Sequence, residues 1–475
     1  MDYSNIVQDV VAQVLQELDS KMNISNSLPT TGQTYGLFQC VDKAVAAAKY
    51  AQKQLSEAGI ETREKIVALL KSIPIQNATS WAELELNETG VGRLDHKIAK
   101  LQIINKVPGV EALKSTLHSG DNGISMDELA PWGVIGCVTP VTHSIPTITA
   151  NAINMIAAGN ALVVNPHPSG YRCAAIAVET YNRAIYQETG IENLIALINP
   201  PTLETANAIF EHRDINLLVV TGGPFVARAA LSQKKRAIVA GPGNPPVVVD
   251  ETADLDLAAR SIITGAAFDN NLLCIGEKEV FVVDQVFEAM MAAMERTIEQ
   301  KAYRLNSDQI AALTEKAFVW KKDHYVVNGE LVGKDCEVLA KSIGLALPPG
   351  QKIDLLYGET GEDNLFVPVE QMMPFVPFVR VPNVATAVEK ALEFEHGFGH
   401  TAIIHSNNLA TITDMGKRAN TTVFVANGPS TGGLGLEGEG FLSYSLATPT
   451  GEGITSPLTF TRFRRMSICG SMGMV

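Results

Sequence analysis

The chain has few cysteines, fewer cations than anions and no long apolar run. Its 475 residues include six Cys, none of them in a CxxC pair, so neither a disulfide framework nor a zinc ribbon is expected. Asp and Glu number 51 against 37 Lys and Arg, which gives a net charge of -14 and argues against a nucleic-acid partner. No stretch of about 18 apolar residues exists to cross a membrane, and the acidic N-terminus lacks the basic start of a secretory signal. These absences favour a cytosolic multi-domain protein, most often an enzyme.

The first 19 residues carry apolar side chains at spacings of one, three and four, the pattern of one helical stripe. The stripe consists of Ile6, Val7, Val10, Val11, Val14, Leu15 and Leu18. Residues 20–36 follow as a polar linker without a core face. A short amphipathic helix on a linker either binds another protein or folds back on its own domain, and the residues alone leave both interpretations open.

From Gly133 onward, short apolar runs alternate with helical segments, and most of the runs end in Gly or Pro. Strands are predicted at 132–140, 161–166, 193–201, 216–224, 236–243 and 245–250, then at 279–283, 365–369, 378–382, 401–406 and 422–427. Helices are predicted at 147–158, 171–188, 203–212, 224–233, 254–268, 286–299, 385–394 and 408–419, after a helical region at 37–107. This alternation predicts two α/β domains built on parallel sheets. Ligands are expected at the carboxyl ends of such strands.

Two motifs give only weak evidence for a ligand site. The glycines of 433–438 form a literal GxGxxG, but the segment that follows is not helical, so a dinucleotide fingerprint is disfavoured and 427–440 is predicted to be a mobile surface loop. His396 and His400 form HxxxH, which suits a metal ion when it lies on a helix. Gly397 and Gly399 make a helix unfavourable there. A loop or strand-edge role is therefore favoured, and no metal site is predicted.

Cys274 is the strongest candidate for chemistry. A lone Cys is usually a buried packing residue. This one lies between a predicted helix and an apolar strand, with Asn270 and Asn271 before it and Gly276 after it. A loop position that opens toward strand ends suits a nucleophile, so both interpretations stand on the residues alone.

Eight segments in order resemble the aldehyde dehydrogenases, specifically the CoA-acylating enzymes of bacterial microcompartments that degrade ethanolamine or 1,2-propanediol. They are residues 130–140, 152–168, 216–226, 240–259, 268–280, 370–381, 396–406 and 448–465. The resemblance implies the aldehyde dehydrogenase fold, with a Rossmann-like NAD-binding domain, an α/β catalytic domain and small oligomerisation strands. The implied divisions are a cofactor-binding domain (37–240, with oligomerisation strands near 115–132), a catalytic domain (241–430) and a C-terminal segment (431–475) that returns to the cofactor domain and the oligomerising strands.

The same resemblance implies partners and a location. The helix at 1–19 is similar to the targeting peptides of encapsulated enzymes, which implies binding to a shell protein or a co-encapsulated enzyme. The implied location is the bacterial cytoplasm, within a microcompartment. A homo-oligomer, either a dimer or a tetramer, is expected.

Residue roles follow from the resemblance. Cys274 matches the nucleophile that attacks the aldehyde, and its backbone N–H together with Thr142 would bind the oxyanion. Asn271, Leu273 and Ile275 would line the substrate pocket. NAD and coenzyme A are the implied cofactor and co-substrate. The implied cofactor-binding residues are Thr139, Pro140, Asn165, His167, Pro168, Thr221, Gly222, Gly223 and Glu370.

Residue 239 separates acylating from hydrolytic chemistry. Hydrolytic relatives have a Glu that activates the deacylating water, and this chain has Val239 at that position. A thioester without a water-activating base persists until a better nucleophile arrives, and a CoA thiolate is one. The sequence therefore favours an acyl-CoA product. The alternatives are a hydrolytic enzyme, reduction of an acyl phosphate, and a non-catalytic scaffold of the shell.

Overall fold

The computed structural model describes residues 35–297, 301–322 and 324–470. The predicted targeting helix at 1–19 and nearly all of the predicted linker lie outside these residues.

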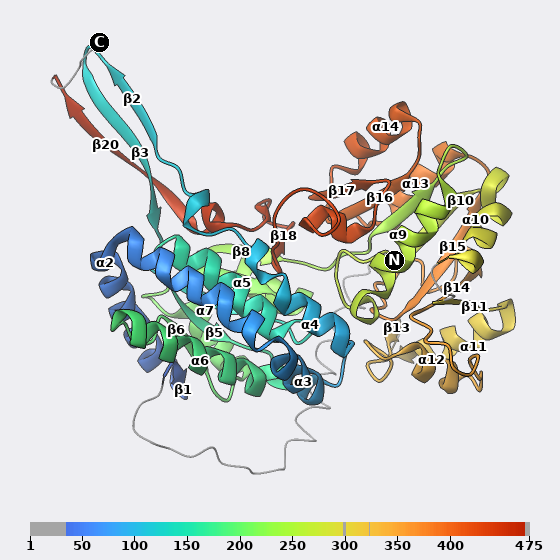
Figure 1. The fold of residues 1–475 in the computed structure, drawn as a ribbon, viewed down its shortest axis with the longest axis horizontal. Coiled ribbons are helices and arrows are strands. Elements are labelled where there is room, and N and C mark those ends of the chain that lie inside the picture. The colour runs from blue at the N-terminus through green and yellow to red at the C-terminus, as the bar shows by residue number, and fades with distance from the viewer. Residues whose placement is uncertain (1–34, 298–300, 323, 471–475) are drawn as a thin grey trace.

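The first sheet has six parallel strands in the order β1-β6-β5-β4-β7-β8. Its strands are β1 (Leu37–Phe38), β4 (Val134–Val138), β5 (Ala161–Asn165), β6 (Ile195–Ile198), β7 (Leu217–Thr221) and β8 (Arg236–Ala240). The helices that join or cover them are α2 (Val41–Gln76), α5 (Ser144–Ala157), α6 (Tyr171–Thr189), α7 (Leu203–Glu211) and α8 (Pro224–Leu231). β4, β5 and β6 are buried along their whole length and carry no polar side chain except Asn165 at the end of β5, as expected of strands covered on both faces. Helix α2, interrupted at Gly59, packs against α5 and α6 (Figure 1).

The second sheet has seven parallel strands in the order β11-β14-β15-β10-β9-β16-β17. Its strands are β9 (Pro246–Val249), β10 (Glu279–Val283), β11 (Ala302–Arg304), β14 (Leu355–Thr360), β15 (Phe375–Val381), β16 (Thr401–His405) and β17 (Val423–Ala426). The helices of this part include α9 (Leu255–Ala267), α10 (Asp284–Arg296), α11 (Ser307–Ala317), α12 (Cys336–Ser342), α13 (Val384–Phe394) and α14 (Leu409–Ala419). The chain passes from one sheet to the other within 241–245, where the sequence predicts the domain boundary. The α/β prediction with two parallel sheets is confirmed.

Two predictions about loops and strands are wrong. Residues 365–369 form turns instead of a strand; their apolar character reflects burial, because Phe366 and Val367 pack into two hydrophobic clusters. The segment 427–440 is only partly a surface loop, since the short helix η6 (Ser430–Leu434) has buried Ser430 and Leu434 side chains.

Smaller elements complete the chain. Helices α3 (Ala78–Thr89) and α4 (Leu94–Gln102) continue the helical N-terminal region. Single turns lie at η1 (Ile104–Lys106), η2 (Val110–Ala112), η3 (Pro168–Gly170), η4 (Phe268–Asn271) and η7 (Pro457–Phe460). Two antiparallel pairs are β12 (Phe318–Lys321) with β13 (His324–Val327), and β18 (Leu446–Ala447) with β19 (Gly453–Ile454). No helix among the described residues combines the length and apolar character needed to cross a bilayer.

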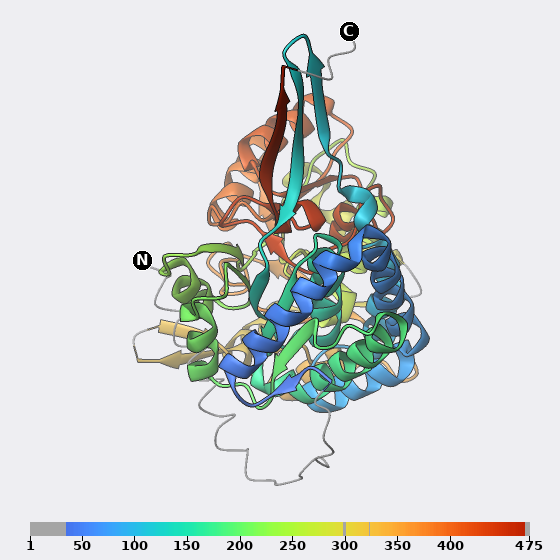
Figure 2. The ribbon, with the colours of Figure 1, turned by 90° about the vertical axis from the view of Figure 1, so that its left-hand side faces the viewer.

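A three-stranded antiparallel arm projects from the body of the molecule (Figures 1 and 2). It consists of β2 (Thr116–Gly120), β3 (Gly123–Pro131) and β20 (Thr461–Cys469), with β3 in the middle. β20 pairs with the whole of β3 and leaves large apolar side chains exposed, among them Phe463 at 84 %. Strands therefore lie where the sequence predicts them near 115–132, and they join the C-terminal segment.

Candidate active site

The strand order of the first sheet locates a ligand site. From β4 the chain adds β5 and β6 on one side, and then returns to add β7 and β8 on the other. The order reverses between β4 and β7, and ligands of open α/β sheets bind at the carboxyl ends of such neighbouring strands. Thr139 and Pro140 follow β4 here, and Thr221 ends β7 before Gly222 and Gly223. These five predicted residues therefore share one edge of the sheet.

The nucleophile loop, residues 268–278, connects α9 to β10 and carries Cys274. Three successive residues near its start have left-handed backbone, with φ of 51° at Asp269, 57° at Asn270 and 62° at Asn271. Asp and Asn tolerate this region better than other residues with a side chain. Each of the three side chains is held by its own hydrogen bonds, which keep this unusual backbone in place.

The first two of these side chains bind distant parts of the chain. Asp269 accepts a hydrogen bond from the Arg93 N–H at 2.8 Å and forms a buried ion pair with Lys100. Asn270 donates to the Gly333 carbonyl at 3.0 Å. The loop is thus anchored to α4 on one side and to the segment between β13 and α12 on the other.

Lys100 joins the two loops that carry the predicted oxyanion donors. Its ammonium contacts His143 Nδ1 at 2.8 Å as well as the Asp269 carboxylate. His143 follows Thr142 and caps α5, and Asp269 lies five residues before Cys274. Thr142 itself is half-buried. The role of Thr142 as a donor remains a prediction, supported by this connection between the loops.

Cys274 is half-buried, and burial raises the pKa of its thiol to about 12. The negative charge of Glu370 raises this pKa further, while the ammonium of Lys278 lowers it. Glu370 is also half-buried and accepts a hydrogen bond from the Gly243 backbone, and its own pKa is raised to about 7 by burial. The predicted nucleophile and Glu370, one of the predicted cofactor-binding residues, therefore lie within electrostatic range of each other.

His400 faces the nucleophile loop across Gly243. A Cβ atom on Gly243 would lie 2.6 Å from the Cys274 carbonyl oxygen and 2.9 Å from His400 Cγ, so only glycine fits between them. The buried His400 ring contacts Thr401 Oγ1 through Nδ1 at 2.8 Å, and its Nε2 has no hydrogen-bond partner among the described residues. Burial lowers its pKa to about 4, so the imidazole is neutral near neutral pH. Nε2 carries the lone pair in the tautomer whose Nδ1–H donates to Thr401.

The sequence predicts His400 at a loop or strand edge and assigns it no chemistry. The residue directly precedes β16, so the strand-edge location is correct. The other histidine of the motif, His396, contacts the Pro368 carbonyl instead. The motif carries no signal for catalysis, because the approach of His400 to Cys274 is a tertiary contact between distant parts of the chain. Among the described residues, no group of three or more His, Cys, Asp or Glu side chains is arranged to hold a metal ion.

The edge between β4 and β7 fits a dinucleotide. A Cβ atom on Gly222 would have no protein atom within 4 Å, so the turn after β7 is open on that side. The Thr139 hydroxyl is buried without a hydrogen-bond partner among the described residues, as expected of a group that awaits a ligand. Gly223 caps α8, whose N-terminus suits a pyrophosphate. Thr221 is already engaged, since its hydroxyl contacts Ser445 Oγ at 2.7 Å.

The predicted residues at the end of β5 are held by the protein itself. Asn165 accepts from Thr205 Oγ1 at 2.6 Å and donates to the Thr202 carbonyl at 3.3 Å. His167 Nδ1 accepts from the Ser169 N–H at 3.1 Å, and burial lowers its pKa to about 4. Pro168 then begins η3. Contact with a cofactor would require Asn165 to exchange these bonds.

The predicted substrate-pocket residues are all buried. Leu273 and Ile275 belong to the main hydrophobic cluster of the first domain, which ties the nucleophile loop to that domain. Asn271 donates to the Glu277 carbonyl at 2.9 Å, so its amide closes the loop on itself. Their role in contacting substrate remains a prediction.

Residue 239 carries no base. Val239 is fully buried in β8, and its N–H donates to Thr450 Oγ1 at 3.1 Å. The nearby acid Glu277 is also occupied, because its carboxylate accepts from both the N–H and the hydroxyl of Ser430 at 2.8 Å. Neither residue offers a free carboxylate to activate water.

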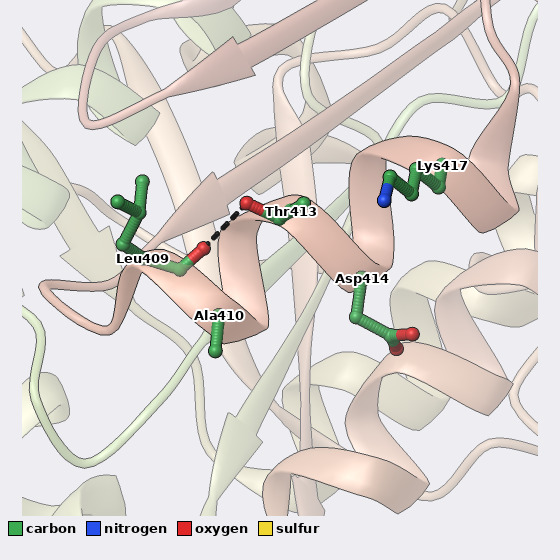
Figure 3. Close-up of a pocket in the computed structure, with 5 residues that line it drawn as sticks. All are labelled: Leu409, Ala410, Thr413, Asp414 and Lys417. Carbon is green, nitrogen blue, oxygen red and sulfur yellow. Dashed lines mark hydrogen bonds between the residues drawn. The ribbon is translucent and has the colours of Figure 1, made fainter.

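A hollow on the outer face of α14 is unrelated to this site. Leu409, Ala410, Thr413, Asp414 and Lys417 line it, all from one helix (Figure 3). The Thr413 hydroxyl donates to the Leu409 carbonyl of the same helix at 2.7 Å. No group identified above lies in this hollow.

Comparison with known proteins fits this geometry. A model described as the aldehyde dehydrogenase family matches residues 20–440, and this chain belongs to that family. The acetaldehyde dehydrogenase (acetylating) EutE of Escherichia coli is 41 % identical over 472 residues, covering 98 % of this chain and all of the relative. A propanal dehydrogenase (CoA-propanoylating) of Salmonella typhimurium is 36 % identical, covering 94 % of this chain and 95 % of the relative.

A solved structure shares the fold over almost its full length. The propionaldehyde dehydrogenase from the fucose utilisation bacterial microcompartment of Clostridium phytofermentans has a TM-score of 0.89 and 39 % identity, covering 93 % of this chain and 100 % of the other. The predicted membership in the acylating branch of the family, with relatives from microcompartments, is confirmed.

Proposed function

We propose that the protein oxidises a short-chain aldehyde, acetaldehyde or propionaldehyde, with NAD+ and CoA to give an acyl-CoA and NADH. The observation that carries this proposal is the buried Val239 at the position where hydrolytic relatives have the water-activating acid. A neutral His400, whose ring lies on the other side of Gly243 from the Cys274 carbonyl oxygen, supports it. The names of the relatives support the choice of aldehydes.

The first half of the reaction belongs to Cys274. Its thiolate attacks the aldehyde carbon and forms a carbon–sulfur bond, while the Cys274 N–H and the Thr142 hydroxyl bind the oxygen that becomes negative. Bound NAD+ supplies a hydride acceptor, and the residues around Thr139, Gly222 and Gly223 would hold it. Loss of the hydride from the carbon leaves an acyl thioester on Cys274.

The second half transfers the acyl group to CoA. Val239 and Glu277 offer no free carboxylate to activate water, so the thioester awaits a thiol. In the tautomer whose Nδ1–H donates to Thr401, the neutral His400 ring has a lone pair on Nε2, which has no hydrogen-bond partner among the described residues and would take the proton of the CoA thiol as that sulfur attacks. The Cys274 thiolate leaves and is ready for another aldehyde.

The partners of the protein are part of this proposal. The exposed apolar side chains of the arm support a homo-oligomer formed through β20 and its neighbours, since large exposed apolar patches mark interaction sites. The helical stripe at 1–19 supports targeting to a shell protein or a co-encapsulated enzyme. A relative from a bacterial microcompartment supports the corresponding location in the bacterial cytoplasm.

The test is NADH formation from acetaldehyde and propionaldehyde, each with and without CoA. Strict dependence on CoA is expected, with the acyl-CoA identified by mass spectrometry. Cys274→Ala should abolish turnover and acyl-enzyme formation. Equal rates without CoA would mean that water deacylates the enzyme, and would favour the hydrolytic alternative. Absence of NADH under all conditions would favour a scaffold.

A further inference from the structure

Lys278 is a fully buried lysine four residues after the nucleophile. Its ammonium donates to the Asn271 carbonyl at 2.8 Å and to the Leu273 carbonyl at 3.4 Å, and it also contacts Asn271 Oδ1. All three acceptors are neutral oxygens of the nucleophile loop. Burying an ammonium costs free energy unless hydrogen bonds replace its lost contacts with water. The hydrogen bonds to the loop therefore fix the position of Lys278, and the same bonds stabilise the conformation of the loop.

The Leu273 carbonyl belongs to the same peptide group as the Cys274 N–H, which is the predicted oxyanion donor. This carbonyl also accepts from the Gly276 N–H at 3.0 Å. Two donors on one side of the peptide fix its plane and polarise the N–H on the other side, because hydrogen-bonded groups strengthen one another in a low-dielectric interior. Lys278 is therefore connected to the oxyanion donor through a single peptide.

The charged groups around Lys278 neutralise only part of its positive charge. Cys274, Glu370, Glu277 and Glu279 all interact with its charge, and His400 lies within range of it as well. Burial raises the pKa of Glu370 and of Glu277 to about 7 and that of Glu279 well above its usual value. Burial lowers the pKa of Lys278 itself, and these neighbours raise it. With pKa values of about 7, Glu370 and Glu277 are ionised only in part near neutral pH, so they leave part of the positive charge of Lys278 to act on the nucleophile.

We propose that Lys278 is a positioning residue for Cys274, which stabilises the thiolate by its charge and orients the oxyanion N–H through the Leu273 carbonyl. This inference rests on the proposed function. Alkylation of Cys274 by iodoacetamide tests it without any aldehyde, so failure of the inference and failure of the proposed activity give different results.

The experiment measures the alkylation rate of the Cys274 peptide against pH by mass spectrometry, which separates this thiol from the exposed Cys40 and Cys469. Lys278→Gln keeps a donor but removes the charge. Near pH 8, well below the midpoint of the thiol, its alkylation rate should be about tenfold slower than that of the parent, which corresponds to a thiol pKa raised by about one unit. Lys278→Arg keeps the charge and should restore most of the rate. An unchanged rate in Lys278→Gln overturns the proposal.

Two controls keep the result specific. Lys97→Met removes a buried ammonium that is paired with Glu85 at 2.8 Å, outside the nucleophile loop, and should leave the alkylation rate near pH 8 unchanged. The double variant Lys278→Met with Glu370→Gln removes both a positive and a negative charge that act on Cys274 and should return the rate toward that of the parent. This second variant avoids an uncompensated buried carboxylate, so it reports on charge even if Lys278→Met alone does not fold. A rate that stays low in it would contradict the electrostatic role.

Discussion

The two parallel sheets contribute different edges to the active site: the first its carboxyl edge, and the second the edge where its strands begin. The first sheet contributes the carboxyl ends of β4 and β7, where Thr139 and Gly222 lie. The second contributes the segments that enter its strands, because Cys274 precedes β10 and His400 precedes β16. The rule that ligands bind at carboxyl ends therefore locates the cofactor residues, and it does not locate the nucleophile or the base.

The second sheet also has a reversal of strand order, between β9 and β16. Its carboxyl edge is filled by the protein's own side chains. Ser406 donates to Asp250 at 2.5 Å, and Thr252 donates to the same carboxylate at 2.7 Å. Asn427 donates to the Ser406 carbonyl at 2.8 Å. A reversal of strand order thus permits a ligand site but does not require one. The side chains of the loops after the strands determine whether a ligand can bind there.

The difference between the two edges of the second sheet can be tested at the two ends of β16, where the largest effect on activity is expected. His400→Gln removes the proposed proton acceptor and should slow acyl transfer to CoA by about 10²–10⁴-fold. Hydride transfer should still occur once, because Cys274 is intact. Rapid-mixing measurements should therefore show a burst of NADH equal to the enzyme concentration, followed by a slow phase, with acyl-enzyme accumulating on Cys274.

His405 provides the matched control. It ends β16, is equally buried, and has a pKa lowered to about 4 by burial. His405→Gln should leave both the burst and the steady rate close to those of the parent. If the two variants behaved alike, the difference between the edges of the second sheet would not be functional.

A smaller effect is expected at the edge of the first sheet. Gly222→Val places a side chain where no protein atom lies within 4 Å of the Cβ. The protein should keep its unfolding temperature, whereas the KM for NAD+ should rise by about 10–100-fold, as overpacking by about 1–3 kcal/mol implies. Steady-state kinetics at saturating CoA measure the rise. An unchanged KM would mean that the cofactor does not bind at the turn after β7.

Much of this arrangement could be predicted from the sequence because strands covered on both faces are continuously apolar. The runs that form β4, β5, β7 and β10 are recognisable for that reason. The same signal failed at 365–369, where Phe366 and Val367 are buried by loops instead of by a sheet. Burial alone does not distinguish a central strand from an apolar turn.

The site was less predictable than the fold. The sequence placed Thr139 and Gly222 at strand ends and Cys274 in a loop before a strand, where the structure also has them; their roles remain predictions. The approach of His400 to Cys274 depends on Gly243, which lies far from both in the sequence. Lys278 is close in sequence to the nucleophile, but only the fold shows that its ammonium turns back to the loop carbonyls.

The smallest effect on activity is expected at the filled carboxyl edge of the second sheet. Ser406→Ala removes the hydroxyl that donates to the buried Asp250 and accepts from the Asn408 N–H at 2.9 Å. Losing a hydrogen bond to a charged group should lower the free energy of unfolding by about 1.5–3 kcal/mol. Turnover and the KM for NAD+ should remain unchanged, since these side chains are engaged in hydrogen bonds within the second sheet and its loops. Denaturant unfolding and steady-state kinetics on the same sample make the comparison. A loss of turnover without a loss of stability would show that this edge, too, binds a ligand.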